Sequence, residues 1–288
     1  MKINNKNIHP GVAFGSIIAI AVIVVGAVWF YAGDNGFSFR DIMSNGDENG
    51  NEEVVSDSGN IAVTSPSPGD SVGLPLVVEG RARVFENSVS LRVRDADGSV
   101  LVEDFTTANA PDIGEFGSFR AELFYPEPEG SEGTLEVYSV SARDGSEIDK
   151  VEISIVFEEV DALTVEVYFT TSETGVVTCE ATEFVERRIP RTQAVGRAAL
   201  EQLLKGPTVN ERSDGFSTSI NPGTELQSLR IENGTAFADF NEMLDFNIGG
   251  SCMVTSIFTQ IENTLLQFDT INDVVISIDG ETEEVLQP

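Results

Sequence analysis

The sequence predicts a single membrane-spanning helix followed by two folded domains, an all-β sandwich and then an α/β domain. Residues 12–32 form an uncharged apolar run, and residues 61–157 alternate apolar and polar side chains between turn-forming clusters. From residue 163 onward, strand patterns are interleaved with two helical ones. The 288 residues leave room beyond the apolar run for about two domains of ordinary size.

The apolar run at residues 12–32 predicts a transmembrane anchor, because about 20 helical residues cross a bilayer core. The run ends in Trp29-Phe30-Tyr31, residue types typical of the membrane–water interface. Two lysines precede it and only Arg40 follows closely, which favours a cytoplasmic N-terminus at residues 1–11 and an exported remainder. A cleaved signal peptide, with a weak cleavage site at Val25-Gly26-Ala27, is the alternative, and it also exports the chain.

The chain is strongly acidic, with a formal net charge of −31 at pH 7 and a pI of about 4.1. Like charges repel, so binding to nucleic acid or to an anionic lipid surface is disfavoured. The acidity suits solubility outside the cell or a salty habitat. A divalent cation or a basic partner is the functional alternative.

Residues 33–60 predict an acidic flexible linker with no helix or strand. The stretch holds seven acids against one arginine and few apolar side chains. Such a composition cannot bury enough apolar surface to offset the entropy of ordering the chain.

Residues 61–157 predict a two-sheet sandwich of about seven strands. Apolar residues recur at every second position, and clusters such as Asp95-Ala96-Asp97-Gly98 supply hairpin turns. That cluster also resembles half of a calcium loop, but the remaining acids of such a loop are absent, which favours the turn. The expected strands include residues 74–78, 89–93, 100–102, 119–123, 135–137 and 151–157.

The start of this segment resembles the immunoglobulin-like domain of bacterial spore germination proteins. The resemblance is carried by Ser65-Pro66-Ser67-Pro68-Gly69-Asp70 and by Gly80-Arg81-Ala82, and it extends over nearly all of residues 61–157. It implies a binding or spacing module without catalytic residues of its own.

Residues 163–288 predict an α/β domain in which two helices cover one face of a mixed sheet. Asn233-Gly234 predicts a two-residue hairpin turn, in preference to a glycosylation acceptor at Asn233-Gly234-Thr235. Gly249-Gly250-Ser251 is expected to supply a hinge and the N-cap of the second helix. In that helix Met253, Ile257, Ile261 and Leu265 form an apolar stripe with Val254 and Phe258 beside it. The expected strands are residues 163–169, 184–189, 226–232, 235–240 and 272–278, and the first helix spans residues 192–205.

This second segment resembles the GerMN domain of sporulation and spore germination proteins. The matching residues are 199–208, Gly249-Gly250-Ser251, 264–268 and 274–280, in that order. The resemblance implies a compact α/β fold, related to ring-building motifs of secretion machines, on the outer side of a membrane. It also implies a role in assembly rather than catalysis.

His9 is the chain's one histidine, and it precedes the predicted anchor on the inner side. No Ser-His-Asp, Cys-His or histidine–metal site is therefore expected outside, and we predict no catalytic residue, cofactor or metal ligand. Paired carboxylates remain an alternative means of glycan hydrolysis. The candidate acids are Asp239, Glu242 and Asp245, with Glu180 and Glu183 near a cysteine; solvated loop acids are the simpler interpretation.

Cys179 and Cys252 are the chain's two cysteines, and both lie on the predicted exported side. An oxidising compartment favours a bridge between them, which closes a loop of about 73 residues and stabilises the fold by roughly 4 kcal/mol before strain. Two buried free thiols, or a reactive or intermolecular role, are the alternatives.

Arg187, Arg188 and Arg191 form a local basic group in an acidic domain. They are candidates for contact with a neighbouring copy or an anionic envelope polymer. The alternative is an edge strand protected from aggregation by its charges.

These observations predict a non-catalytic, single-pass membrane protein whose exported domains bind envelope proteins or cell-wall polymer, with a homo-oligomer possible and no nucleic-acid partner. The alternatives are a carboxylate-dependent cell-wall glycan hydrolase, and a sensor or solute-binding module.

Overall fold

The computed structural model describes residues 53–171, 181–283 and 285–286. The predicted anchor at residues 12–32 lies outside these residues. Within the described part of the chain, no helix has the length and apolar character needed to cross a membrane. The anchor therefore stays a prediction.

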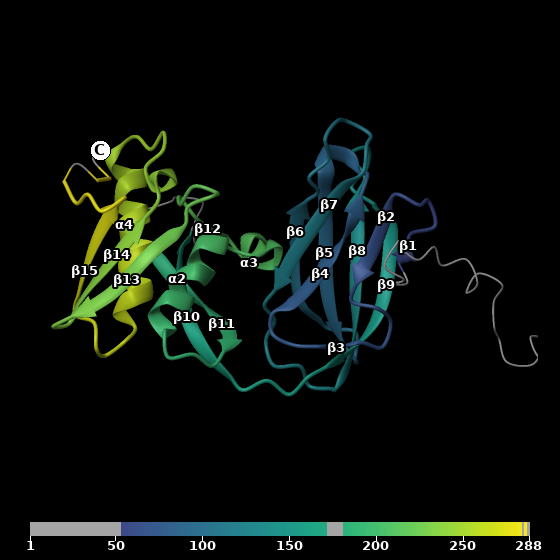
Figure 1. Ribbon diagram of the computed structural model, residues 1–288, viewed down its shortest axis with the longest axis horizontal. Coiled ribbons are helices and arrows are strands. Elements are labelled where there is room, and N and C mark those ends of the chain that lie inside the picture. Colours follow the sequence, from purple (N-terminus) through teal and green to yellow (C-terminus); the bar gives the residue numbers. More distant parts are fainter. Residues whose placement is uncertain (1–52, 172–180, 284, 287–288) are drawn as a thin grey trace, which may run out of the picture. The chain divides into compact units, whose positions relative to one another are not determined.

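The first folded region is a sandwich of a four-stranded and a five-stranded sheet, with strand orders β1-β2-β4-β7 and β3-β9-β8-β5-β6 (Figure 1). All pairs are antiparallel except β3 and β9. This confirms the predicted sandwich. Its strands are β1 (Val54–Val55), β2 (Ile61–Ser65), β3 (Ser71–Val72), β4 (Leu76–Ala82), β5 (Ser88–Asp95), β6 (Val100–Thr107), β7 (Gly117–Leu123), β8 (Glu132–Val140) and β9 (Glu147–Phe157), and a short 3₁₀ turn covers Phe85–Asn87.

The core of the sandwich follows directly from the alternation along its strands. Val89, Leu91 and Val93 of β5 are fully buried, and Leu91 and Val93 pair with Val137 and Leu135 of β8. Side chains of successive strand residues point to opposite faces, so the residues between them face outward. Arg92 is one of these, and it begins the outer polar surface described below.

One strand lies where the sequence predicts only linker. β1 pairs with β2, with Val54 opposite Val63, and Glu53 is buried and accepts two hydrogen bonds from Arg81. The expectation of no strand in residues 33–60 was therefore wrong at its C-terminal end. Two residues are too few to produce a detectable alternation, and here pairing with β2 fixes the strand.

The second folded region contains two three-stranded sheets, where one mixed sheet was expected. The order β11-β10-β12 is antiparallel, whereas β13-β14-β15 is mixed because β14 and β15 run parallel. Its elements are β10 (Ala162–Thr171), β11 (Thr182–Pro190), α2 (Val195–Lys205), α3 (Val209–Ser213), β12 (Phe216–Ser217), β13 (Leu226–Glu232), β14 (Thr235–Phe240), a 3₁₀ turn at Glu242–Leu244, α4 (Ser251–Leu266) and β15 (Asp273–Ile278).

Helices α2 and α4 each pack against both sheets. They pack against each other, α2 also contacts β10 and β13, and α4 contacts β10 and β15 (Figure 1). The stripe predicted on α4 is fully buried at Ile257, Ile261 and Leu265, but Met253 is 41% exposed because it lies in the first turn. Within the predicted Gly249-Gly250-Ser251 stretch, Gly250 is the N-cap at φ 88°, and Ser251 is the first helical residue.

The hairpin between β13 and β14 is confirmed, together with its turn. Asn233 and Gly234 have φ angles of 52° and 88°, the left-handed conformation that a two-residue hairpin turn requires. The turn fixes the register of β13 and β14, and β15 adds beside β14 at the edge of the sheet.

Candidate interaction site

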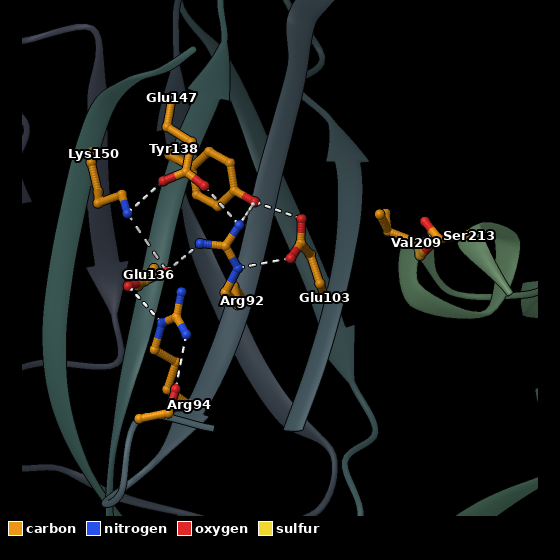
Figure 2. A network of polar contacts seen from close by, with 10 residues as sticks. Arg92, Arg94, Glu103, Glu136, Tyr138, Glu147, Lys150, Val209 and Ser213 are labelled. Carbon is orange, nitrogen blue, oxygen red and sulfur yellow. Dashed lines mark hydrogen bonds and ion pairs between the residues drawn. The ribbon is translucent and has the colours of Figure 1, made fainter. Parts of the chain in front are cut away.

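The outward face of β5, β6, β8 and β9 carries a connected group of charged side chains, which we call the arginine network (Figure 2). Its members are Arg92 and Arg94 of β5, Glu103 of β6, Glu136 and Tyr138 of β8, and Glu147 and Lys150 of β9. The members on β5, β6 and β8, and Lys150 on β9, occupy positions that alternate with the core residues of their strands. Glu147 lies beyond the register shift between β8 and β9, which brings it to the same face.

Arg92 lies at the centre of the arginine network. Its Nε donates to Glu103 at 2.8 Å and its Nη1 to Glu136 at 2.7 Å. Its Nη2 donates to both Glu147 and the Tyr138 hydroxyl at 2.7 Å, and the guanidinium carbon stands 4.8 Å from the Tyr138 ring centroid. The side chain is only 10% exposed, so the guanidinium is held by a nearly complete set of partners.

The charges of the arginine network balance, with three cations against three carboxylates. Hydrogen bonds from Arg92 and then Lys150 lower the pKa of Glu147 from 4.5 to about 2, and the bond from Arg92 likewise lowers the pKa of Glu103. These carboxylates are therefore held ionised and paired, which suits a structural role in the sheet rather than proton transfer.

The three arginines singled out from the sequence do not face one way. Arg187 and Arg188 are adjacent on β11, so their side chains lie on opposite faces of the strand. Arg187 forms a two-pronged ion pair with Glu211 of α3, and Arg191 pairs with Asp161 at 2.8 Å. Their role in an interaction stays a prediction.

Of the acids considered for hydrolysis, Asp239 lies near the end of β14, Asp245 directly follows the 3₁₀ turn at Glu242–Leu244, and Glu183 lies on β11. Asp239 Oδ1 accepts hydrogen bonds from Ser277 Oγ at 2.6 Å and from the backbone N–H of Gly280 at 2.9 Å, which ties β14 to β15 and to the turn after it. Glu242 begins the 3₁₀ turn that follows, and Glu180 lies outside the described residues. Across the described ranges, no three His, Cys, Asp or Glu side chains gather as metal ligands would.

The calcium-like motif is a turn, as the sequence favoured. Asp95 is 5% exposed and accepts hydrogen bonds from the backbone N–H groups of Ala96, Glu129 and Gly130 at 2.7, 2.6 and 3.3 Å. Asp97 accepts one from the N–H of Ser99. The two acids thus organise neighbouring loops.

An apolar groove of about 430 Å³ runs between α4 and β15. Among the strands that the structure describes, β15 is the last of its sheet, and Val274, Val275 and Ile276 along it line this groove. We call it the α4–β15 groove. Its lining residues are Val254, Thr255 and Phe258 of α4, Val274, Val275 and Ile276 of β15, and Thr282, Val285 and Leu286 of the segment after β15.

Comparison with known families matches both folded regions. Residues 60–146 match the immunoglobulin-like domain of bacterial spore germination, and residues 166–284 match the family described as sporulation and spore germination. The chain therefore carries an immunoglobulin-like domain of the spore germination type followed by a GerMN-type domain.

Three solved structures are similar to this chain, and each match covers 42% of its residues. The tandem GerMN domains of the sporulation protein GerM from Bacillus subtilis share 21% identity at a TM-score of 0.36, and the match spans 40% of that chain. The first GerMN domain of the same protein shares 22% identity over 85% of its length, with a TM-score of 0.32. A putative lipoprotein from Clostridium perfringens shares 18% identity over 76% of its length, with a TM-score of 0.28. No curated protein matches the chain.

In the GerMN-type domain, the structure describes only one of the two cysteines that the sequence predicts to pair. Cys252 is the second residue of α4, and the part of the chain that the structure describes contains no free thiol. Cys179 lies outside the described residues. The pairing of Cys179 with Cys252 stays a prediction.

Sequence reasoning did not identify the α4–β15 groove as a site. The signal was present, because Val254 and Phe258 lie beside the buried stripe of α4 and widen its apolar face. What the pattern could not show is that β15 ends its sheet and leaves Phe258 37% exposed beside it.

Proposed function

We propose that this GerMN-type protein is a non-catalytic, membrane-anchored envelope protein. Residues 12–32 span the membrane with residues 1–11 inside, and the exported domains bind envelope proteins or cell-wall polymer. The uncharged span and the lysines before it support this orientation, and the two family matches are of the sporulation and spore germination type.

The α4–β15 groove is the observation that supports binding best. It offers apolar side chains beside a free strand edge, a combination typical of sites that accept another protein segment. By contrast, two of the ionisable groups selected from the sequence are engaged within the fold. Asp239 holds the β14–β15 end and Arg187 pairs with Glu211. Side chains that do chemistry more often stand in clefts with perturbed pKa values.

Crosslinking in intact cells, followed by mass spectrometry, tests the proposal. We expect the full-length chain to be joined through its exported domains to envelope proteins or polymer, whereas the same chain crosslinked after purification gives contacts within or between copies. An assay of peptidoglycan turnover by the purified full-length chain tests the alternative, a cell-wall hydrolase. Turnover that is lost in Asp239→Asn would overturn the non-catalytic assignment.

A further inference from the structure

We propose that the α4–β15 groove binds an extended, basic segment of a partner protein, which adds as a strand to the free edge of β15. This inference rests on the proposed binding function and specifies the partner's chemistry. It is carried by three features of the described residues: an unpaired strand edge, an exposed aromatic wall, and a uniformly acidic surround.

The free edge of β15 is the first feature. On one side, β15 pairs with β14 in parallel from Thr235 opposite Asp273 to Phe240 opposite Ile278. On the other side, within the described residues, the only pairing is a bridge between Ile278 and Glu281. The outward-pointing backbone groups of residues 273–277 therefore have no strand partner there, and such an edge is a template for another strand.

The apolar wall is the second feature. Phe258 of α4 is 37% exposed and lines the groove together with Val254 and Val275. An added strand places every second side chain on the groove side, where apolar residues would cover Phe258. Covering an exposed aromatic ring contributes hydrophobic stabilisation that backbone pairing alone does not supply.

The acidic surround is the third feature, and it selects the partner. No Lys, Arg or His occurs between Arg230 and the last residue of the sequence. Asp273, Glu281 and Glu283 are exposed next to lining residues, and Glu262 lies one helical turn after Phe258. No ion pair involves these acids in the described part of the chain. Their field attracts a segment rich in lysine or arginine and repels nucleic acid and a second copy of a chain with net charge −31.

The direct test measures binding of a labelled ten-residue peptide of alternating valine and lysine to the full-length chain in neutral detergent. Valine then lies on one face of the added strand and lysine on the other. We expect Phe258→Lys to weaken binding by roughly tenfold or more, because it places a charge in the groove. Leu266→Lys is the matched control. Leu266 is 38% exposed on the same helix but does not line the groove, and this variant should bind within roughly twofold of the unchanged chain.

A second arm tests the charge. An alternating valine and glutamate peptide should bind at least roughly tenfold more weakly than the lysine peptide. Raising the salt concentration should weaken the binding of the lysine peptide. The double variant Glu281→Lys, Glu283→Lys should lower affinity for the lysine peptide without affecting the fold, since both residues are exposed.

Hydrogen exchange then identifies strand addition. Peptide binding should slow exchange of backbone amides in residues 273–277, and this protection should be absent in Phe258→Lys. Equal binding by Phe258→Lys and Leu266→Lys, or binding without added protection in β15, would overturn the inference. So would a concentration-dependent dimer of the unchanged chain that Phe258→Lys abolishes, because that result assigns the groove to a second copy.

The two proposals fail differently. If the lysine peptide does not bind while in-cell crosslinks to envelope partners persist, strand addition at β15 is wrong and the binding function stands. If the crosslinks are absent, the proposed function fails whatever the peptide does.

Discussion

Arg92 shows how a single buried charge is accommodated on the face of a sheet. Removing a guanidinium from water is costly, and the cost is offset only when the charge meets several well-placed partners. Arg92 meets three carboxylates and a phenol, and Glu136 among them is only 8% exposed. The partners therefore depend on one another, because removal of Arg92 takes a hydrogen bond from each of the three carboxylates at once.

Truncation of Arg92 should destabilise the protein strongly. We expect Arg92→Ala to lower the free energy of unfolding by about 3 kcal/mol, since it leaves Glu103 without its ion-pair partner and removes one of the two arginines that pair with the buried Glu136. Thermal unfolding of the full-length chain followed by circular dichroism measures the effect. Arg120→Ala is the control, because Arg120 is 54% exposed while pairing with Glu79 and Glu122, and its loss should cost less than about 1 kcal/mol. Similar losses in the two variants would contradict this account.

The depressed pKa of Glu147 predicts sensitivity to acid. Arg92 and Lys150 hold that pKa at about 2, below its ordinary value of 4.5, so the folded state binds the proton less readily than the unfolded chain. The stability from this pairing is therefore present above about pH 4.5 and is lost as the pH falls towards 2. Unfolding midpoints measured across this range should fall less steeply for Glu147→Gln than for the unchanged chain. Identical slopes would show that Glu147 does not contribute.

At the scale of the element, Gly80 explains how closely the strands of the first sheet approach one another. A Cβ at this position would lie 2.3 Å from the carbonyl oxygen of Ala62 on β2 and 2.7 Å from the ring of Phe119 on β7. The glycine of the Gly80-Arg81-Ala82 motif is therefore required by space on both sides of β4, and neither the backbone nor the buried ring has room to shift.

Substitution of this glycine should disrupt the sheet. We expect Gly80→Ala to destabilise the protein by about 3 kcal/mol through overpacking against β2 and β7. Gly73→Ala serves as the control, because its Cβ would meet only the Glu158 carboxylate at an ordinary 3.6 Å, and its cost should stay within about 0.5 kcal/mol. Chemical denaturation of both variants measures the difference. A Gly80→Ala protein as stable as Gly73→Ala would refute the packing argument.

Elements with strong periodicity were predictable from the sequence, and those fixed by pairing alone were not. Alternation located β5 and β9, and the spacing of apolar residues located α2 and α4. Strand β1 has two residues and exists through its bonds to β2. The separation of the second region into two sheets was equally hidden, because no local pattern reports which strands become neighbours.

Helix α3 carried a readable signal that sequence reasoning passed over. Thr208 accepts a hydrogen bond from the N–H of Glu211, and the Glu211 carboxylate accepts one from the N–H of Thr208, which completes a capping box. Threonine followed three residues later by glutamate is the pattern that predicts it. The partners of Arg92 left no such trace, since they come from three other strands.

At the scale of the whole molecule, the two cysteines bear on the compartment. We expect peptide mapping under non-reducing conditions to recover Cys179 joined to Cys252 in protein taken from the cell envelope. Cys252→Ser should then lower the free energy of unfolding by about 4 kcal/mol, because the loop it frees is long. Two free thiols in the purified protein would exclude the bridge.

The molecule as a whole combines a predicted anchor with two domains whose charged groups largely serve their own folds. The acids around the α4–β15 groove, by contrast, are available to a basic partner. An envelope partner can reach the groove only if the domains lie on the outer side of the membrane, so sidedness is the central claim.

Protease added to intact protoplasts tests sidedness most directly. We predict that the enzyme removes the bulk of the chain and leaves a short membrane-bound remnant containing residues 12–32, while a cytoplasmic protein in the same cells stays whole. Lysed protoplasts provide the control for protease access to both proteins. A full-length chain that survives in intact protoplasts, and is cut only after lysis, would contradict the exported, anchored arrangement.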